Sequence, residues 1–236
     1  MELKDRLVQL LEQAHAVEEA FISQESASEG REQGAPDGWS AKELVAHITV
    51  WKQVLVDRLH NPQHDPAAGV NHNDYQAHVF DSYPDKSWDA VQERAQQVFR
   101  SLLAAVKDLS DDELNDSHYF QWGSRRPVWR HVVQPGFNHP NTHIAEFEHR
   151  RGNVQQAMLL QEANAEGLRW LCDEPDWCGI AVYNLACYYA TTEQVDRALR
   201  RLREALTLNP SLKQWASQDP DLLPLQYEPA FRSLLV

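Results

Sequence analysis

The chain has 236 residues, 42% of them hydrophobic and 9% aromatic, and this composition is typical of a folded protein with a substantial core rather than of a disordered chain. Its formal net charge of −13 disfavours nucleic-acid binding, because an acidic surface repels the phosphate backbone. No apolar run reaches the roughly 18 residues of a membrane span, and with three cysteines and no signal-peptide layout at its start we expect a cytoplasmic protein.

The first elements in chain order are predicted to be helices. Glycine is scarce, at nine residues, and alternating strand patterns are nearly absent, so the sequence predicts an all-α protein. Apolar residues recur at helical spacing over residues 3–21, which predicts a first helix. Ser40 followed by Glu43 has the pattern of a capping box, so a second helix is expected to begin there and to end near His60. A short helix is expected at about 73–80.

Two further helices complete a predicted four-helix bundle. Ser87 is a suitable N-cap for the third helix, which is expected to continue to about Val106. An aromatic loop over 116–127 separates it from a fourth helix over about 128–150. That fourth helix is interrupted by Pro135, Gly136 and Pro140. Four amphipathic helices with long connections predict a bundle, a fold that places metal sites between facing helices.

The sequence changes character after the bundle. From Gly179 onward the 34-residue tetratricopeptide (TPR) pattern fits without a gap. Its small, apolar, aromatic and proline positions are matched by Leu185, Ala186, Tyr189, Ala198, Leu202, Ala205 and Pro210. Because a lone repeat cannot bury its own face, the helix before it and the tail after it are expected to cap it. We therefore predict two domains, a four-helix bundle over 1–152 and a TPR-like helical hairpin with capping helices over 153–236.

Three histidines form a candidate metal site. His139 and His143 are four residues apart, so on a helix they lie on one face, and His47 on the second helix supplies a third imidazole. Three neutral imidazoles leave the charge of a divalent ion unbalanced and leave coordination positions open, which suits hydrolysis or thiolate transfer. The candidate ions are zinc, nickel and manganese. The alternative is three ordinary histidines that bind no metal.

Four residues are candidates for the surroundings of this site. Trp51 lies one turn after His47, and Tyr119 and Trp122 lie in the aromatic loop, so these three are predicted to form a pocket wall. Glu146, one turn after His143, is a candidate acceptor for a ligand's second ring nitrogen. The alternatives are core packing for the aromatic residues and a solvated carboxylate for Glu146.

These motifs resemble known families. The segment 37–51, together with the later histidine pair, resembles the DinB-like four-helix bundle superfamily, and the region 71–89 with the Trp122 loop looks most similar to its ClbS/DfsB branch. Residues 183–190 with 219–231 resemble TPR modules. The superfamily resemblance implies a divalent-metal site with His47, His139 and His143 as ligands. It also implies activity as a thiol S-transferase or, in the ClbS/DfsB branch, hydrolysis of a reactive small molecule in self-protection.

The resulting functional hypothesis is a metal-dependent hydrolase or thiol S-transferase that detoxifies a reactive small-molecule substrate. Two alternatives stay open. In one, the chain is an interaction protein that binds a protein partner through residues 153–236, with the bundle as a scaffold. In the other, the bundle is a metal-free small-molecule hydrolase of the ClbS/DfsB type. The superfamily resemblance includes a homodimer as one expected state, and neither nucleic acid nor a membrane is expected as a partner.

Overall fold

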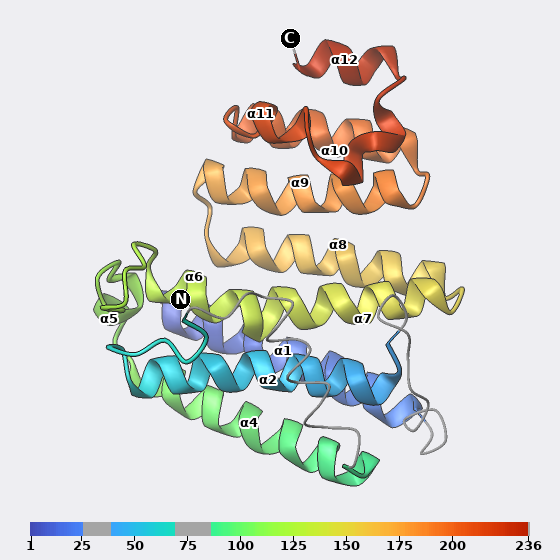
Figure 1. The fold of residues 1–236 in the computed structure, drawn as a ribbon. Helices are drawn as coiled ribbons and strands as arrows, with labels where there is room; N and C mark the ends of the chain where they lie inside the picture. The colour runs from blue at the N-terminus through green and yellow to red at the C-terminus, as the bar shows by residue number, and fades with distance from the viewer. Residues whose placement is uncertain (26–38, 69–85, 236) are drawn as a thin grey trace. The chain divides into compact units, whose positions relative to one another are not determined.

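The computed structural model describes residues 1–25, 39–68 and 86–235, and within these ranges every regular element is a helix (Figure 1). The predicted all-α class is therefore confirmed for the described part of the chain. The chain divides into two compact units, Met1–Ala157 and Met158–Val236. None of the described helices is long and apolar enough to cross a membrane. The short helix predicted at about 73–80 lies outside the described residues.

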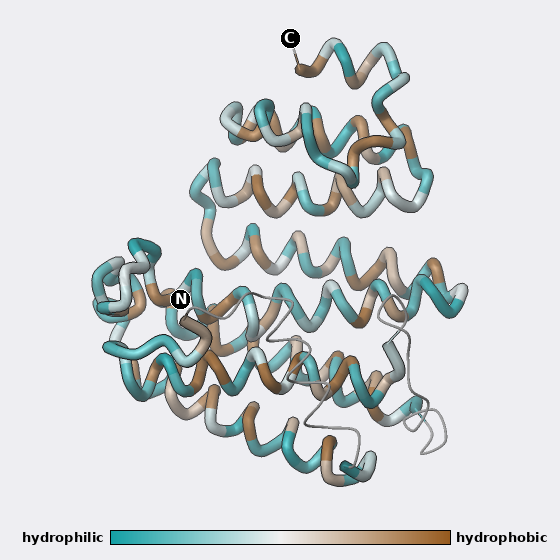
Figure 2. The backbone as a smooth tube through the Cα atoms, viewed as in Figure 1, coloured by the Kyte–Doolittle hydropathy of each residue, from teal (hydrophilic) through white to brown (hydrophobic). Residues whose placement is uncertain are grey.

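The first unit is built from four long helical segments around one apolar core. These are α1 (Leu3–Gln24), α2 (Ala41–His60), α4 (Trp88–Asp108) and a fourth segment made of α6 (Val128–Val133), η2 (Gln134–Asn138) and α7 (His139–Arg150), preceded by the short α5 (Asp111–Asn115). Helix α1 contacts both α4 and α7, and so does α2, so the four segments close around a common interior. Hydrophobic and hydrophilic residues alternate along each helix (Figure 2), as expected where one face of a helix is buried.

The start of α2 is fixed by the predicted capping box. The backbone N–H of Glu43 donates to Ser40 Oγ at 3.2 Å, and the backbone N–H of Ser40 donates to Glu43 Oε2 at 2.8 Å. Each residue thus satisfies an amide that the first helical turn leaves without an intrahelical acceptor. The prediction from the Ser40 and Glu43 spacing is confirmed, and it sets the register of His47 farther along the helix.

The predicted interruption of the fourth helix is a π-helical turn rather than a break. In η2 the backbone N–H of His139 donates to the carbonyl of Gln134, five residues earlier. A proline in a helix removes one amide donor and collides with the carbonyl four residues before it, and the wider π turn accommodates Pro135 and Pro140 without ending the helix. Gly136 brings this turn against α1, because a Cβ atom at this position would lie 2.3 Å from Leu11 Cδ2.

The second unit consists of shorter helices after a long one. Helix α8 (Val154–Leu171) spans the boundary between the units, and it is followed by α9 (Pro175–Thr191), α10 (Val195–Leu208), α11 (Leu212–Ala216), η3 (Pro220–Leu225) and α12 (Pro229–Leu235). Helices α9 and α10 form a hairpin whose turn contains Glu193 with a φ of 61°. The two helices meet along small and apolar residues, which include Ala186, Ala198, Leu202 and Ala205.

One carboxylate links η3 to α9 in addition to their apolar contacts. The hydroxyl of Tyr183 donates to Asp219 Oδ2 at 2.7 Å, and the backbone N–H of Asp221 donates to Asp219 Oδ1 at 3.0 Å. Burial and the hydrogen bond to Asp219 raise the pKa of the Tyr183 hydroxyl, so it stays protonated and remains a donor. Asp219 therefore both caps η3 and holds it against α9, as a capping segment requires. The assignment of this unit to the TPR class stays a prediction.

Candidate metal centre

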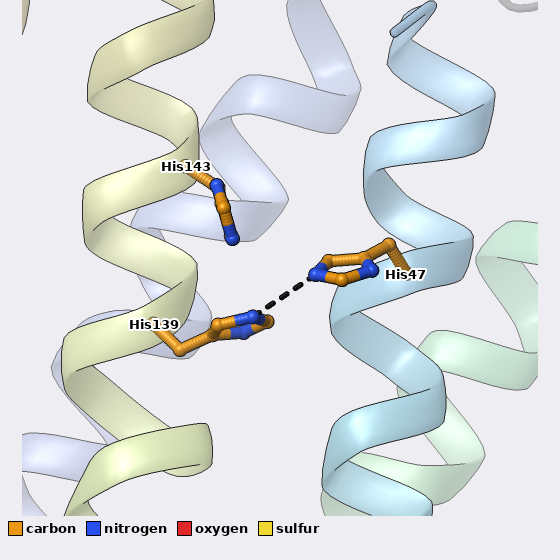
Figure 3. A group of neighbouring side chains, drawn as sticks. All are labelled: His47, His139 and His143. Atoms are coloured by element: carbon orange, nitrogen blue, oxygen red, sulfur yellow. Dashed lines mark hydrogen bonds between the residues drawn. The ribbon is translucent and has the colours of Figure 1, made fainter. Parts of the chain in front are cut away.

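The three predicted ligands converge inside the first unit (Figure 3). His47 extends from α2, and His139 and His143 extend from α7. The Nε2 atoms of His47 and His139 lie 3.0 Å apart, across 92 residues of sequence. One ligand atom from each of the three imidazoles lies within 4.8 Å of the other two. The three histidines that the sequence predicts to share one site therefore lie close together in the structure.

Local structure explains how the pair keeps its register. Helix α7 begins at His139, and Pro140 occupies its second position, where a missing amide hydrogen costs little. His139 and His143 therefore stand on consecutive turns, with ring centroids 4.5 Å apart. The opposing His47 has no solvent exposure, and it lies between Ala46 and Ile48, which are also buried.

The donor set fits a divalent ion. Two imidazole nitrogens bound at about 2.1 Å to one ion lie about 3.0 Å apart at a right angle and about 3.4 Å apart in a tetrahedron. The 3.0 Å separation between Nε2 of His47 and Nε2 of His139 matches the right-angle value. Since all three donors are nitrogens and His139 and His143 are partly exposed, the centre resembles an open site more than a closed structural one.

Glu146 restrains the ring of one candidate ligand, His143. The Nδ1–H of His143 donates to Glu146 Oε2 at 2.8 Å. With Nδ1 engaged, the Nε2 atom of His143 faces the other two imidazoles (Figure 3). A carboxylate on the second ring nitrogen is the usual arrangement around metal-binding histidines, because it sets the tautomer and makes the free nitrogen more basic.

Two tryptophans flank the three imidazoles. The ring centroid of Trp51 lies 6.4 Å from those of both His47 and His139. Trp39 lies closer, at 4.4 Å from His47 and 5.5 Å from His143. Sequence reasoning predicted Trp51 and overlooked Trp39. The available signal was its position directly before the Ser40 cap, which places it beside the first turns of α2, where His47 lies.

Comparison with known proteins identifies the family of the first unit. The model of the DinB superfamily matches residues 4–147. The chain belongs to the DinB superfamily. No curated protein and no solved structure matches the chain. The resemblance inferred from the α2 motif and the histidine pair is thus confirmed at the level of the superfamily.

In the DinB domain, the predicted loop aromatics gather around a fourth histidine. The ring centroids of Trp122 and His131 lie 5.6 Å apart, and the Cζ atom of Arg58 lies over the Trp122 ring, 5.2 Å from its centroid. Tyr119 packs on Phe120. Among the described residues, neither Tyr119 nor Trp122 has a ring contact with the three candidate ligands. Their place in the wall of a substrate pocket stays a prediction.

His131 is held as a neutral hydrogen-bond partner. Its Nε2 lies 2.6 Å from Ser124 Oγ, and that hydroxyl also accepts the backbone N–H of Arg126. Burial, followed by the charges of Arg58 and Arg126, lowers the pKa of His131 to about 4. A neutral Nε2 can accept the Ser124 hydroxyl, so this pair ties the aromatic loop to α6 in the DinB domain.

Proposed function

We propose that this DinB-superfamily protein is a metal-dependent enzyme that acts on a reactive small molecule by hydrolysis or thiol transfer. The proposal depends on one observation, the convergence of His47, His139 and His143 from two helices. These residues are the proposed ligands of a divalent ion, with zinc, nickel or manganese as candidates. When bound, such an ion acts as a Lewis acid that polarises a carbonyl or lowers the pKa of a coordinated water or thiol.

One side of the candidate metal centre is rigid, and the other side is accessible to solvent and substrate. His47 is enclosed by the core and cannot swing away from the centre. His143 is 25% exposed and held by Glu146, so a substrate can reach the centre from this side. The rings of Trp39 and Trp51 offer flat apolar surfaces to the carbon skeleton of a substrate, and apolar walls with a few polar groups are typical of small-molecule sites.

Metal content tests the first step of this proposal. Protein purified without a histidine tag is expected to contain about one equivalent of divalent metal by elemental analysis, and His139→Ala is expected to contain none. His118→Ala is the matched control, because the His118 side chain is 72% exposed and lies in a loop. Absence of bound metal in the native protein, even after addition of zinc, nickel and manganese, contradicts a metal-dependent function.

The need for a thiol co-substrate distinguishes a thiol S-transferase from a hydrolase. An electrophilic or hydrolysable probe is incubated with the protein in the presence and absence of a low-molecular-weight thiol. Turnover only with thiol supports an S-transferase, and turnover in water alone supports a hydrolase. Activity that survives exhaustive chelation supports the metal-free alternative suggested by the resemblance to the ClbS/DfsB branch.

For the remainder of the chain, we propose a TPR-like module over 153–236 that follows a bundle domain over 1–152. Support comes from the α9–α10 hairpin, in which Ala186 and Ala198 are fully buried. Small residues at the crossing of two helices allow the close approach that such a hairpin requires. The proposed role of this module is to bind a protein partner or a second copy of the chain, with catalysis confined to the bundle.

A further inference from the structure

A cavity of about 380 Å³ opens between α1 and α4. This volume is within the range of small-molecule sites and corresponds to roughly a dozen water molecules. Its polar lining consists of His15, Glu18, Glu19, Ser23, Glu25, Gln92 and Gln96, so none of the three candidate metal ligands contributes to it. The cavity is therefore a separate feature of the DinB domain.

A buried ion pair lies beneath this cavity. Lys52 Nζ of α2 contacts Glu18 Oε2 of α1, and each side chain is only 2% exposed. Burying such a pair requires stripping water from both charges, and a well-packed apolar pair of the same volume is often at least as stable. The buried pair is therefore only weak evidence of a stabilising role, and its position next to the cavity is the feature relevant to ligand binding.

The carboxylate of Glu18 has one oxygen available. Oε2 is engaged by Lys52, while Oε1 accepts no hydrogen bond from any residue that the structure describes. Oε1 is not among the enclosed polar atoms of the described residues, so it is open to the space of the cavity, where a ligand N–H can donate to it. Beside it, the His15 ring is stacked on Phe99 at 3.7 Å between centroids, which gives the site an aromatic wall.

Among the described residues, the charged groups that line the cavity and their ion-pair partners sum to one unit of negative charge. Three of the lining residues carry carboxylates. Glu18 is balanced by Lys52, and Glu25 by two hydrogen bonds from Arg151 at 2.5 and 2.8 Å. The third, Glu19, lies 3.3 Å from His15 Nε2. Burial lowers the pKa of His15, so this imidazole is neutral at pH 7 and leaves the charge of Glu19 uncompensated.

We propose that this cavity binds a small organic cation whose ammonium or amidinium group donates hydrogen bonds to Glu18. The single positive charge of the ligand balances Glu19, and the amides of Gln92 and Gln96 supply further polar contacts at the α4 side. The inference is independent of the proposed metal-dependent activity, because the two sites share no residue.

Three isosteric probes test the charge requirement. Benzamidinium, benzamide and benzoate are titrated separately into the full-length protein at pH 7 and followed by isothermal titration calorimetry. Benzamidinium is expected to bind at least tenfold more tightly than benzamide, and benzoate is expected not to bind. Equal binding of the charged and neutral probes, or no binding of benzamidinium at 10 mM, overturns the proposal.

Three variants locate the binding site. Glu19→Gln is expected to weaken benzamidinium binding two- to fivefold, while Glu12→Gln, a matched glutamate on α1 outside the cavity, leaves it unchanged. Ala95→Leu fills the cavity and is expected to abolish binding, with its fold checked by circular dichroism. Equal effects of the Glu12 and Glu19 variants, or full binding by a folded Ala95→Leu protein, contradict the assignment.

Discussion

At the scale of single residues, the proposed metal centre depends on groups that orient the imidazoles as much as on the imidazoles themselves. His143 is partly exposed and has rotational freedom unless Glu146 restrains it. His47, by contrast, is fixed by burial. The two ligands are thus held by different means, one by a hydrogen bond and the other by packing, and the hydrogen-bonded one is easier to perturb without unfolding the protein.

Removing the Glu146 carboxylate is expected to weaken metal binding without abolishing it. In Glu146→Ala, Nδ1 of His143 loses its acceptor, and loss of such a partner typically lowers metal affinity 10- to 100-fold. The measurement is a competition titration against a chelator of known affinity. Glu12→Ala, at an exposed position on α1, serves as the control. Unchanged affinity in the Glu146 variant means that this carboxylate does not orient a ligand.

The neutral state of His131 predicts a pH dependence of stability. Its pKa in the folded protein is about 4, below the ordinary value of 6.5. Between these values the unfolded chain takes up a proton that the folded protein does not, so stability falls as the pH drops from 6.5 towards 4. His131→Asn keeps a hydrogen-bond acceptor for Ser124 but does not titrate in this range.

The expected result for His131→Asn is a shallower loss of unfolding free energy between pH 6.5 and 4 than in the wild-type protein, measured by denaturant unfolding at each pH. The exposed His118→Asn variant is expected to retain the wild-type slope. His15, whose pKa is also lowered by burial, contributes to all three proteins alike. A parallel curve for His131→Asn shows that His131 is protonated as readily in the folded as in the unfolded state.

At the scale of elements, the π turn in the fourth helical segment positions the histidine pair of the candidate site. The π turn at η2 absorbs two prolines and delivers His139 at the start of a regular helix. Gly136 within this turn allows it to lie against Leu11 of α1. Because α7 continues directly from this contact, the packing of the turn sets where the histidine pair stands relative to α2.

Gly136→Ala is expected to destabilise the protein, although alanine is the better helix former by about 1 kcal/mol. The added Cβ would lie 2.3 Å from Leu11 Cδ2, and overpacking of a buried position costs about 1–3 kcal/mol. Denaturant unfolding measures the change. In combination with Leu11→Ala the cost of the glycine substitution is expected to shrink, because the colliding methyl group is gone. A stabilised Gly136→Ala protein contradicts this account of the contact.

At the scale of the whole molecule, a ligand that binds only the folded protein stabilises it by mass action. Free zinc at 100 times its dissociation constant is expected to add about 2.7 kcal/mol to the stability of the DinB domain. Thermal unfolding with increasing zinc is expected to show a rising midpoint in the wild-type protein and no rise in His139→Ala. An equal rise in both proteins indicates binding elsewhere on the surface.

Truncation tests whether the two proposed domains are independent. A fragment of residues 1–152 is expected to unfold cooperatively and to bind metal as the full chain does, because its four helical segments close around their own core. Circular dichroism melts and metal titration are the measurements. A fragment that is insoluble, or folded but unable to bind metal, shows that residues 153–236 complete the site or the fold.

The sequence by itself determined the features that depend on a short stretch of chain. The Ser40 and Glu43 cap, the helical spacing of apolar residues and the four-residue register of His139 and His143 are local, because caps and helical periodicity involve neighbours within a few turns. The same reasoning placed Glu146 beside His143, since residues three apart on a helix are adjacent. It also led to the DinB superfamily through a short motif on α2.

Only the tertiary structure decided which distant segments meet. The 3.0 Å contact between His47 and His139 joins residues 92 positions apart, and it depends on how α7 packs, including the Gly136 contact, rather than on either local pattern. Trp39 beside the site, Trp122 around His131 and the cavity above Glu18 likewise arise between helices. Helical spacing shows which side chains share one face of a helix. Only tertiary packing decides which other helix that face contacts.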